Sequence, residues 1–154
     1  MTMRIEISKT LTQDQAKQID YFWNEVYPVK LKNRFGLLLK DIKEFNHHIL
    51  LNETDEVIGW AATFLRDEEI WFSILVSAEN QNKGYGNMLI DSLKQNFKNL
   101  CGWVIDHNND LKQDGSTYSS PIQFYLKNGF VLMEDRIETD IISAVKIKYE
   151  ASLK

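Results

Sequence analysis

The pattern of apolar and polar positions predicts a chain in which strands and helices follow one another. Runs rich in β-branched and aromatic residues predict strands over 3–7, 48–51, 57–65, 70–76, 103–106, 130–134 and 145–149. Helical spacing predicts helices from Thr12 to Pro28, over about 31–42, after the glycines near position 85, and over 121–128. Thr12 and Gln15 resemble a capping box, and Gly36 weakens the second helix. This order predicts a mixed α/β sheet covered by helices on both faces.

Composition adds limits on size and function class. The 154 residues suit a single domain over 1–154, with 44% hydrophobic and 26% charged residues. A net charge of −4 without a Lys/Arg cluster argues against a nucleic-acid partner. We expect no membrane partner, because no apolar run approaches the ~18 residues of a span and no signal peptide opens the chain. The lone Cys101 fits a reducing cytoplasm and a buried structural thiol rather than a nucleophile, and the histidines show no metal-ligand spacing.

A glycine-containing turn after the predicted strand 70–76 is the strongest chemical signal. Gln81-Asn82-Lys83-Gly84-Tyr85-Gly86 lies between that strand and a helix whose apolar residues are at 89, 93, 97 and 100. The first N–H groups of a helix lack partners, and the positive end of the helix dipole lies behind them. We expect Gly84 and Gly86 to reach positive φ and let the backbone approach an anion closely. The turn therefore predicts a site for a phosphorylated cofactor.

Two common nucleotide motifs fit this turn poorly. A nucleoside-triphosphate loop needs Gly-Lys followed by Ser or Thr, whereas Lys83 precedes the glycine here. A dinucleotide fingerprint needs a third glycine where Leu89 stands, although Asp106, 20 residues after Gly86, is where a ribose-binding acid is expected. A module that binds NAD or another nucleotide is therefore a remaining but distant alternative.

The Gln-x-x-Gly-x-Gly pattern after an apolar strand resembles the acyl-CoA loop of the GNAT superfamily of N-acetyltransferases. A second segment, Phe124-Tyr125-Leu126-Lys127-Asn128-Gly129-Phe130, is similar to the late helix-to-strand motif of that family, with Tyr four residues before Gly-Phe. The resemblance runs best from about residue 70 to residue 130. It implies a mostly antiparallel sheet of about six to seven strands, splayed open between the fourth and fifth strands.

The resemblance also implies acetyl-CoA as the cofactor and names the residues that would bind it. The pantetheine arm would pair with the backbone of Ile74, Leu75 and Val76, as an added strand does. The pyrophosphate would meet the N–H groups of the loop and of the first helical turn. These loop residues are Gln81, Asn82, Lys83, Gly84, Tyr85, Gly86 and Asn87. Lys83 would add charge attraction or would be an exposed loop lysine.

Acetyl transfer to an amine needs a proton acceptor for the ammonium and an acid near the leaving thiolate. By position, Tyr125 matches the usual acid of the family, and the alternative is a core aromatic. Many members carry a carboxylate in the strand where Ser73 stands here, so the base is less certain. Asp106 and His107 end the next strand and form a candidate catalytic pair, and the alternatives are a turn cap and an exposed histidine. The amine could also lose its proton through water, and we expect Glu68 and Glu69 to be solvated in a turn.

The polar stretch 108–120 is longer than a simple connection needs, and long loops often carry function. Tyr118 stands where the family often has an asparagine that contacts the cofactor, so we expect it to contact a ligand.

These observations predict a cytoplasmic N-acetyltransferase that moves an acetyl group from acetyl-CoA to a primary amine by direct attack in a ternary complex. The acceptor would be a small molecule or a peptide, and the chain is compatible with a homodimer. The main alternative is a CoA-binding sensor or inactive relative, in which Ser73 and Tyr118 mark lost catalysis.

Overall fold

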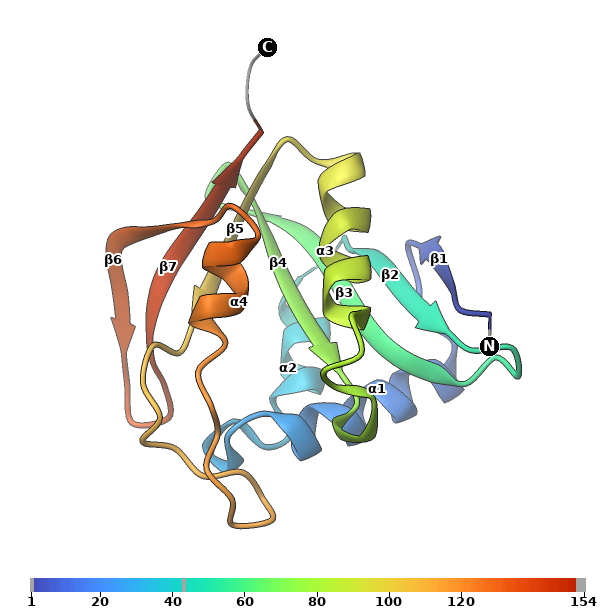
Figure 1. The fold of residues 1–154 in the computed structure, drawn as a ribbon, viewed down its shortest axis with the longest axis horizontal. Helices are drawn as coiled ribbons and strands as arrows, with labels where there is room; N and C mark the ends of the chain where they lie inside the picture. Colours follow the sequence, from blue (N-terminus) through green and yellow to red (C-terminus); the bar gives the residue numbers. More distant parts are fainter. Residues whose placement is uncertain (1, 43, 152–154) are drawn as a thin grey trace.

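One twisted sheet of seven strands organises the molecule (Figure 1). The computed structural model describes residues 2–42 and 44–151. Its strands lie in the order β1-β2-β3-β4-β5-β7-β6 and pair antiparallel, except β4 and β5, which are parallel. Their bounds are β1 (Arg4–Ser8), β2 (Asn46–Leu51), β3 (Val57–Arg66), β4 (Glu69–Val76), β5 (Asn99–Val104), β6 (Val131–Glu138) and β7 (Ser143–Glu150). The mixed sheet predicted from the sequence is confirmed.

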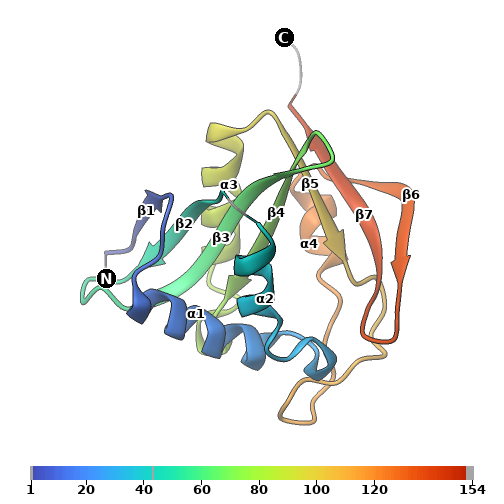
Figure 2. The same cartoon turned by 180° about the vertical axis from the view of Figure 1, so that it is seen from behind.

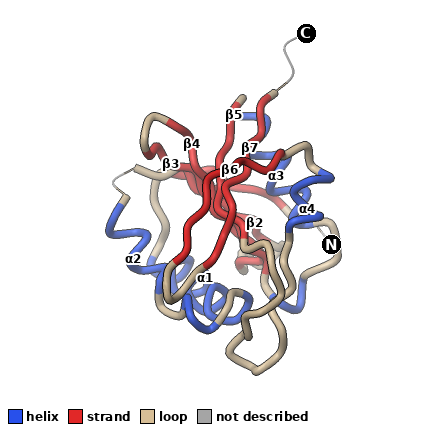
Figure 3. Tube along the Cα trace, turned by 90° about the vertical axis from the view of Figure 1, so that its left-hand side faces the viewer, coloured by secondary structure: helices blue, strands red, loops and turns tan. Residues whose placement is uncertain are grey.

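Helices cover both faces of the sheet, as the sequence predicted. In Figure 2, α1 (Gln13–Val26) and α2 (Arg34–Asp41) lie in front of the sheet. On the opposite face lie α3 (Tyr85–Asn96) and α4 (Ile122–Lys127), and Figure 3 shows the sheet between the two layers. Short 3₁₀ turns, η1 (Val29–Leu31) and η2 (Ala78–Asn80), follow α1 and β4. A separate hydrophobic core lies on each side of the sheet. Because successive side chains of a strand point to opposite faces, those of β4 alternate between the two cores.

The N-terminal part of the chain follows the predicted signals closely. The capping box is present, because the Gln15 N–H donates to Thr12 Oγ1 at 3.0 Å and the Thr12 N–H donates to Gln15 Oε1 at 3.0 Å. The predicted helix over 31–42 is divided into η1 and the shorter α2, which begins only at Arg34 because Asn33 takes a left-handed conformation. No helix among the described residues has the length and apolar character that crossing a membrane requires.

The segment after α3 differs from the prediction. Leu100 continues the apolar spacing of α3, yet the helix ends at Asn96 and Leu100 lies in β5. The strand predicted over 103–106 begins four residues earlier, at Asn99. Phe97 is already extended, with φ −138° and ψ 132°, so the continued spacing is a coincidence between a helix face and the strand that follows. Asp106 and His107 therefore lie in the loop after β5.

The sheet opens between β4 and β5. Trp71 and Cys101 are the only residues at which the described parts of these strands pair, and beyond this point the strands diverge toward the lower part of Figure 1. Lys146 of β7 holds the closed end together, because its Nζ lies 2.6 Å from Glu69 Oε1, and Cys101 Sγ lies 3.2 Å from Glu69 Oε2. Glu69 is therefore in β4 and paired, and only Asp67 and Glu68 form the turn in which both glutamates were expected.

Candidate active site

A cavity of about 690 Å³ passes through the sheet where β4 and β5 separate. On one side it is lined by residues that pack with α3 and α4, such as Ile74, Val76 and Tyr125. On the other side it is lined by residues that pack with α1 and α2, such as Trp23, Trp71 and Trp103. We call these the α3–α4 side and the α1–α2 side. The opening between the strands thus joins two chambers of different composition.

Side chains, rather than a neighbouring strand, satisfy the carbonyl groups of β4 at the opening. The Ser77 N–H donates to Ile58 O at 3.0 Å, so the alternation of backbone groups turns those of Ile74 and Val76 away from β3 and toward β5. There the Tyr27 hydroxyl donates to the Ile74 carbonyl, and Gln81 Nε2 donates to the Val76 carbonyl at 3.2 Å. The backbone of Leu75, by the same alternation, faces β3. This stretch of β4 is therefore an unpaired strand edge inside a cavity.

The turn between β4 and α3 places an open helix N-terminus at the same cavity. Gly84 is the N-cap of α3, with φ 85°, and no side chain caps the helix. The N–H groups of Tyr85, Gly86 and Asn87 belong to the first turn and have no earlier carbonyl of the helix to bind. All four residues line the cavity, together with Gln81 and Asn82. The arrangement fits an anion.

The two glycines serve different purposes. Gly84 has the expected positive φ, and a Cβ there would meet nothing within 4 Å. Gly86 lies inside α3 without positive φ, and a Cβ there would come within 3.2 Å of the Phe124 ring. The expectation of positive φ is therefore wrong for Gly86, where close packing of α4 on α3 instead leaves little room for a Cβ. Asn82, with φ 63°, supplies the second left-handed residue of the turn.

Tyr125 of α4 reaches the cavity from the α3–α4 side. Its ring is packed among Phe72, Phe124 and Phe130, with ring centroids 5.1–5.8 Å away. The side chain is 7% exposed, and its hydroxyl makes no hydrogen bond to another side chain or backbone group of the described residues. Burial raises the pKa of the Tyr125 hydroxyl well above its usual value of 10.0, and the nearby Tyr27 and Tyr118 hydroxyls add to this effect. Tyr125 is therefore a fixed, protonated donor.

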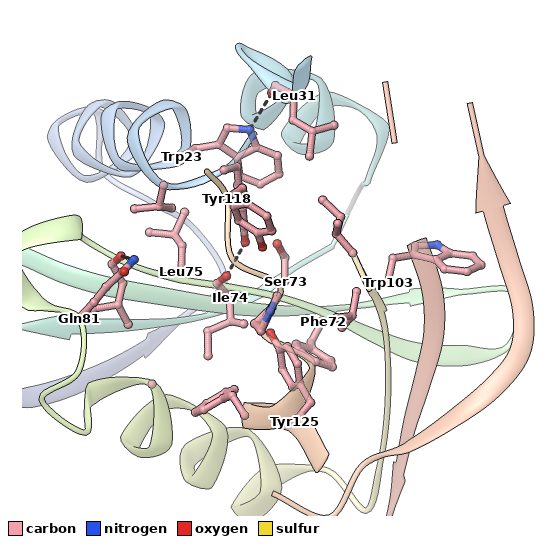
Figure 4. A pocket seen from close by; sticks show the side chains of 18 of the residues that line it. Trp23, Leu31, Phe72, Ser73, Ile74, Leu75, Gln81, Trp103, Tyr118 and Tyr125 are labelled. Atoms are coloured by element: carbon pink, nitrogen blue, oxygen red, sulfur yellow. Dashed lines mark hydrogen bonds between the residues drawn. The ribbon is translucent and has the colours of Figure 1, made fainter. Parts of the chain in front are cut away.

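Tyr118 approaches the unpaired stretch of β4 from the opposite side to Tyr125 (Figure 4). The loop that carries it is held against η1, because the Val29 N–H donates to Leu111 O at 2.8 Å. Within the loop, the Tyr118 N–H donates to Asp110 O at 2.9 Å. Burial, together with Tyr27 and Asp110, raises the pKa of the Tyr118 hydroxyl. The loop 108–120 thus closes one wall of the cavity.

Tyr27 and Ser73 form a hydroxyl pair on the α1–α2 side. The Tyr27 hydroxyl contacts both the Ser73 side chain and the Ile74 carbonyl, and burial raises the pKa of this phenol to about 12. No pattern in the sequence indicated a role for Tyr27. It is the C-cap of α1, already extended with ψ 164°, and so it falls outside the helical periodicity that placed its neighbours.

Several predicted site residues lie outside the cavity. Asp106 is held by Arg136, whose Nη1 and Nη2 lie 2.8 and 3.2 Å from its carboxylate oxygens, and this contact lowers the pKa of Asp106. His107 faces Asp110, with 4.0 Å between Nε2 and Oδ2. Neither residue lines the cavity, nor does the exposed Lys83. Their suggested roles gain no support from this geometry.

Cys101 is buried beside Glu69. Its side chain is 1% exposed, and burial together with the carboxylate raises the pKa of the thiol to about 11. A thiol in this state is a weak nucleophile. The structure agrees with the prediction of a structural cysteine.

Comparison with known proteins identifies the fold and the family. Residues 44–132 match the acetyltransferase (GNAT) domain family. An acyl-CoA N-acyltransferase from Pseudomonas aeruginosa superposes with a TM-score of 0.72 at 12% identity, over 96% of this chain and 99% of that one. The ribosomal-protein-S18-alanine N-acetyltransferase from Escherichia coli superposes with a TM-score of 0.64 at 18% identity, over 98% and 96% of the two chains.

A third solved structure includes the cofactor. The phosphinothricin acetyltransferase from Sinorhizobium meliloti, solved in complex with AcCoA, superposes with a TM-score of 0.62 at 15% identity, over 96% of this chain and 88% of that one. A comparison with curated proteins gave no match. At these identities the solved structures establish the fold, and the domain match covers more than half of the residues. The chain belongs to the GNAT acetyltransferase family.

Proposed function

We propose that this protein is an N-acetyltransferase that uses acetyl-CoA and acetylates a primary amine by direct attack in a ternary complex. The observation that carries the proposal is the cavity through the sheet, which joins an open helix N-terminus, an unpaired stretch of β4 and a protonated tyrosine. Family membership supports acyl transfer in general. The donor and the type of acceptor are our inference from the site.

The residues present fit acetyl-CoA. The N–H groups of Tyr85, Gly86 and Asn87 would hold the pyrophosphate, and the left-handed Gly84 leaves its approach free of a Cβ. The backbone of Ile74 and Val76 would hold the pantetheine arm as a strand partner would, with the Tyr27 and Gln81 side chains released from their carbonyls. When bound, acetyl-CoA supplies the activated acyl thioester.

Hydroxyl groups on the two sides of β4 would take part in the two proton transfers of the reaction. The Tyr125 hydroxyl, protonated and without another described partner, would donate a proton or a hydrogen bond to the departing sulfur. Ser73 and Tyr27, on the other side of β4, would orient the amine and the waters that take its proton. Among the described residues that line the cavity there is no Asp, Glu or His, so we assign no side-chain base. The buried, protonated Cys101 argues against a covalent acetyl carrier.

The missing carboxylate also favours a second candidate, a relative that binds CoA but lacks catalysis. Thermal unfolding with acetyl-CoA, with NAD and ATP as controls, tests binding first. At about 100 times the dissociation constant, a ligand stabilises the fold by about 2.7 kcal/mol. A rise with acetyl-CoA alone supports the cofactor assignment, and no rise contradicts it.

Release of free thiol in the presence of a panel of amines then separates the two candidates. The enzyme should release thiol with some amine at a rate above hydrolysis without an acceptor. Binding of acetyl-CoA without release of thiol at any pH from 7 to 10 would favour the inactive relative.

A further inference from the structure

The α1–α2 side of the cavity is an aromatic chamber, and no Asp or Glu is among the described residues that line it. Its rings come from separate parts of the chain, and Trp71 and Trp103 lie next to each other with centroids 5.4 Å apart. The aromatic residues are Trp23, Tyr27, Phe64, Trp71, Trp103 and Tyr118. Within the described lining the charged side chains are Arg66 and Lys112, both cationic. A polycationic amine would find no carboxylate here, whereas a flat body and an anion would find partners.

Arg66 is held in the chamber by aromatic rings. Its guanidinium carbon lies 5.0 Å from the centroid of Phe64 and 5.7 Å from that of Trp71. The side chain is half-buried, and no carboxylate of a described residue lies within 4.0 Å of it. A guanidinium attracted to ring faces can still donate its N–H groups to an anion. Arg4 and Arg136, in contrast, each bind a carboxylate.

The distance along the sheet between Ser73 and Arg66 would set the length of an acceptor that contacts both. Ser73, at the opening where the acyl group would be attacked, is two residues from Trp71 on the same face, or about 6.6 Å along the strand. Arg66, paired in register with Glu69, lies on the far side of Trp71 from Ser73. An anion bound by Arg66 is therefore separated from the reacting amine by several bonds, with a flat body between them against Trp71 and Trp103.

Lys112 is a weaker candidate for the same role. It lies in the loop 108–120, close enough to Asp114 to help lower the pKa of that carboxyl, so its charge is partly offset. An ammonium is also a point charge, whereas the planar guanidinium binds a carboxylate through two parallel hydrogen bonds.

We propose that the acceptor is a primary amine with a flat apolar body and a carboxylate, or a similar anion, at its far end, and that Arg66 determines this specificity. The inference rests on the proposed function and adds the class of acceptor to it. Amine and anion would bind at opposite ends of one chamber.

Three probe amines test the proposal by thiol release with acetyl-CoA. 4-(Aminomethyl)benzoate carries the anion, 4-(aminomethyl)benzamide has the same shape without charge, and benzylamine lacks both groups. The benzoate should have at least a tenfold higher kcat/KM than the benzamide. Arg66→Gln should lower kcat/KM for the benzoate by roughly 10- to 100-fold and change that for the benzamide less than threefold. Arg66→Lys should restore part of the preference.

Matched variants and a binding measurement keep the outcomes distinct. Lys112→Gln removes the other cation of the lining and should keep the preference. Equal kcat/KM for benzoate and benzamide, or an unchanged preference in Arg66→Gln, would overturn the proposal. If no amine of the wider panel is turned over, the proposed function fails, and calorimetric titration of the benzoate and the benzamide into the CoA-bound protein still tests the anion site. Tighter binding of the benzoate that is lost in Arg66→Gln supports the anion site, and equal binding refutes it.

Discussion

The two sides of the cavity are built from different parts of the chain. On the α3–α4 side, the candidate phosphate site consists of backbone N–H groups from one short segment, 84–87. On the α1–α2 side, the chamber consists of side chains from α1, β3, β4, β5 and the loop 108–120. A site made of one local backbone conformation leaves a motif in the sequence. A site made of side chains gathered from five elements leaves none.

The same contrast explains why the two sides should differ in tolerance to change. The backbone site depends on conformation, and a side chain at Gly84 would strain that conformation because φ there is 85°. The side-chain chamber depends on several rings and one cation, so a substitution changes its selectivity more than its existence.

Gly84→Glu should weaken acetyl-CoA binding by more than 100-fold. The substitution places an L side chain at φ 85° and a negative charge where the pyrophosphate would lie. Gly115→Glu is a matched control, because Gly115 has the same φ of 85° and open space but lies outside the cavity. Calorimetric titration should show lost binding only in the first variant. Equal affinity of Gly84→Glu and the wild type would remove the phosphate assignment.

Turnover should rise with pH as the acceptor amine loses its proton. Because the described lining contains no Asp, Glu or His, kcat/KM should increase about tenfold per pH unit below the pKa of the acceptor and level off above it. The midpoint should move with the pKa of the amine when two acceptors of different basicity are compared by thiol release. A midpoint that stays the same for both amines would reveal a side-chain base of the protein instead.

Tyr125→Phe should lower kcat by roughly 10- to 100-fold and change the affinity for acetyl-CoA less than threefold. The substitution removes the hydroxyl but keeps the ring that packs among Phe72, Phe124 and Phe130. Tyr149→Phe, at a ring that also contacts Phe130 but does not line the cavity, should behave as the wild type. Unchanged turnover in Tyr125→Phe would make this tyrosine a packing residue only.

The smallest expected effect is on the pH dependence of stability and comes from His47, which is buried on the α1–α2 side of the sheet. Burial lowers the pKa of His47 from 6.5 to about 4, and its Nδ1 accepts a hydrogen bond from Trp60 Nε1 at 3.0 Å. The folded state therefore binds fewer protons than the unfolded state between these pH values. The contribution of His47 to the free energy of unfolding should be at its maximum above pH 6.5. It should fall by up to about 3 kcal/mol as the pH drops to 4.

Denaturant unfolding at pH 7, 5.5 and 4 measures this dependence. His47→Gln can accept the same hydrogen bond without titrating in this range. The variant should therefore lose less stability between pH 7 and pH 4 than the wild type. An identical loss in both proteins would assign the acid sensitivity elsewhere, for instance to the buried His48, whose pKa burial also lowers.

Local signals predicted the fold well wherever one physical cause dominated. The capping box at Thr12 placed the start of α1, and the β-branched run after Glu69 placed β4. The prediction went wrong where two patterns overlapped, as at Leu100, whose spacing continues that of α3 although the residue belongs to β5. Gly86 was correctly singled out, but for positive φ, because its contact with Phe124 joins segments almost forty residues apart.

The sequence by itself determined the order of the elements, the glycine turn, and the spacing that places Tyr125 ahead of Gly129 and Phe130, because each depends on contacts between near neighbours in the chain. Only the tertiary structure decided that Tyr27 and Gln81 satisfy the open edge of β4, that Arg136 engages Asp106, and that Arg66 faces the cavity. These contacts depend on how strands and helices pack across the sheet. Nothing in the neighbouring residues of the sequence specifies them.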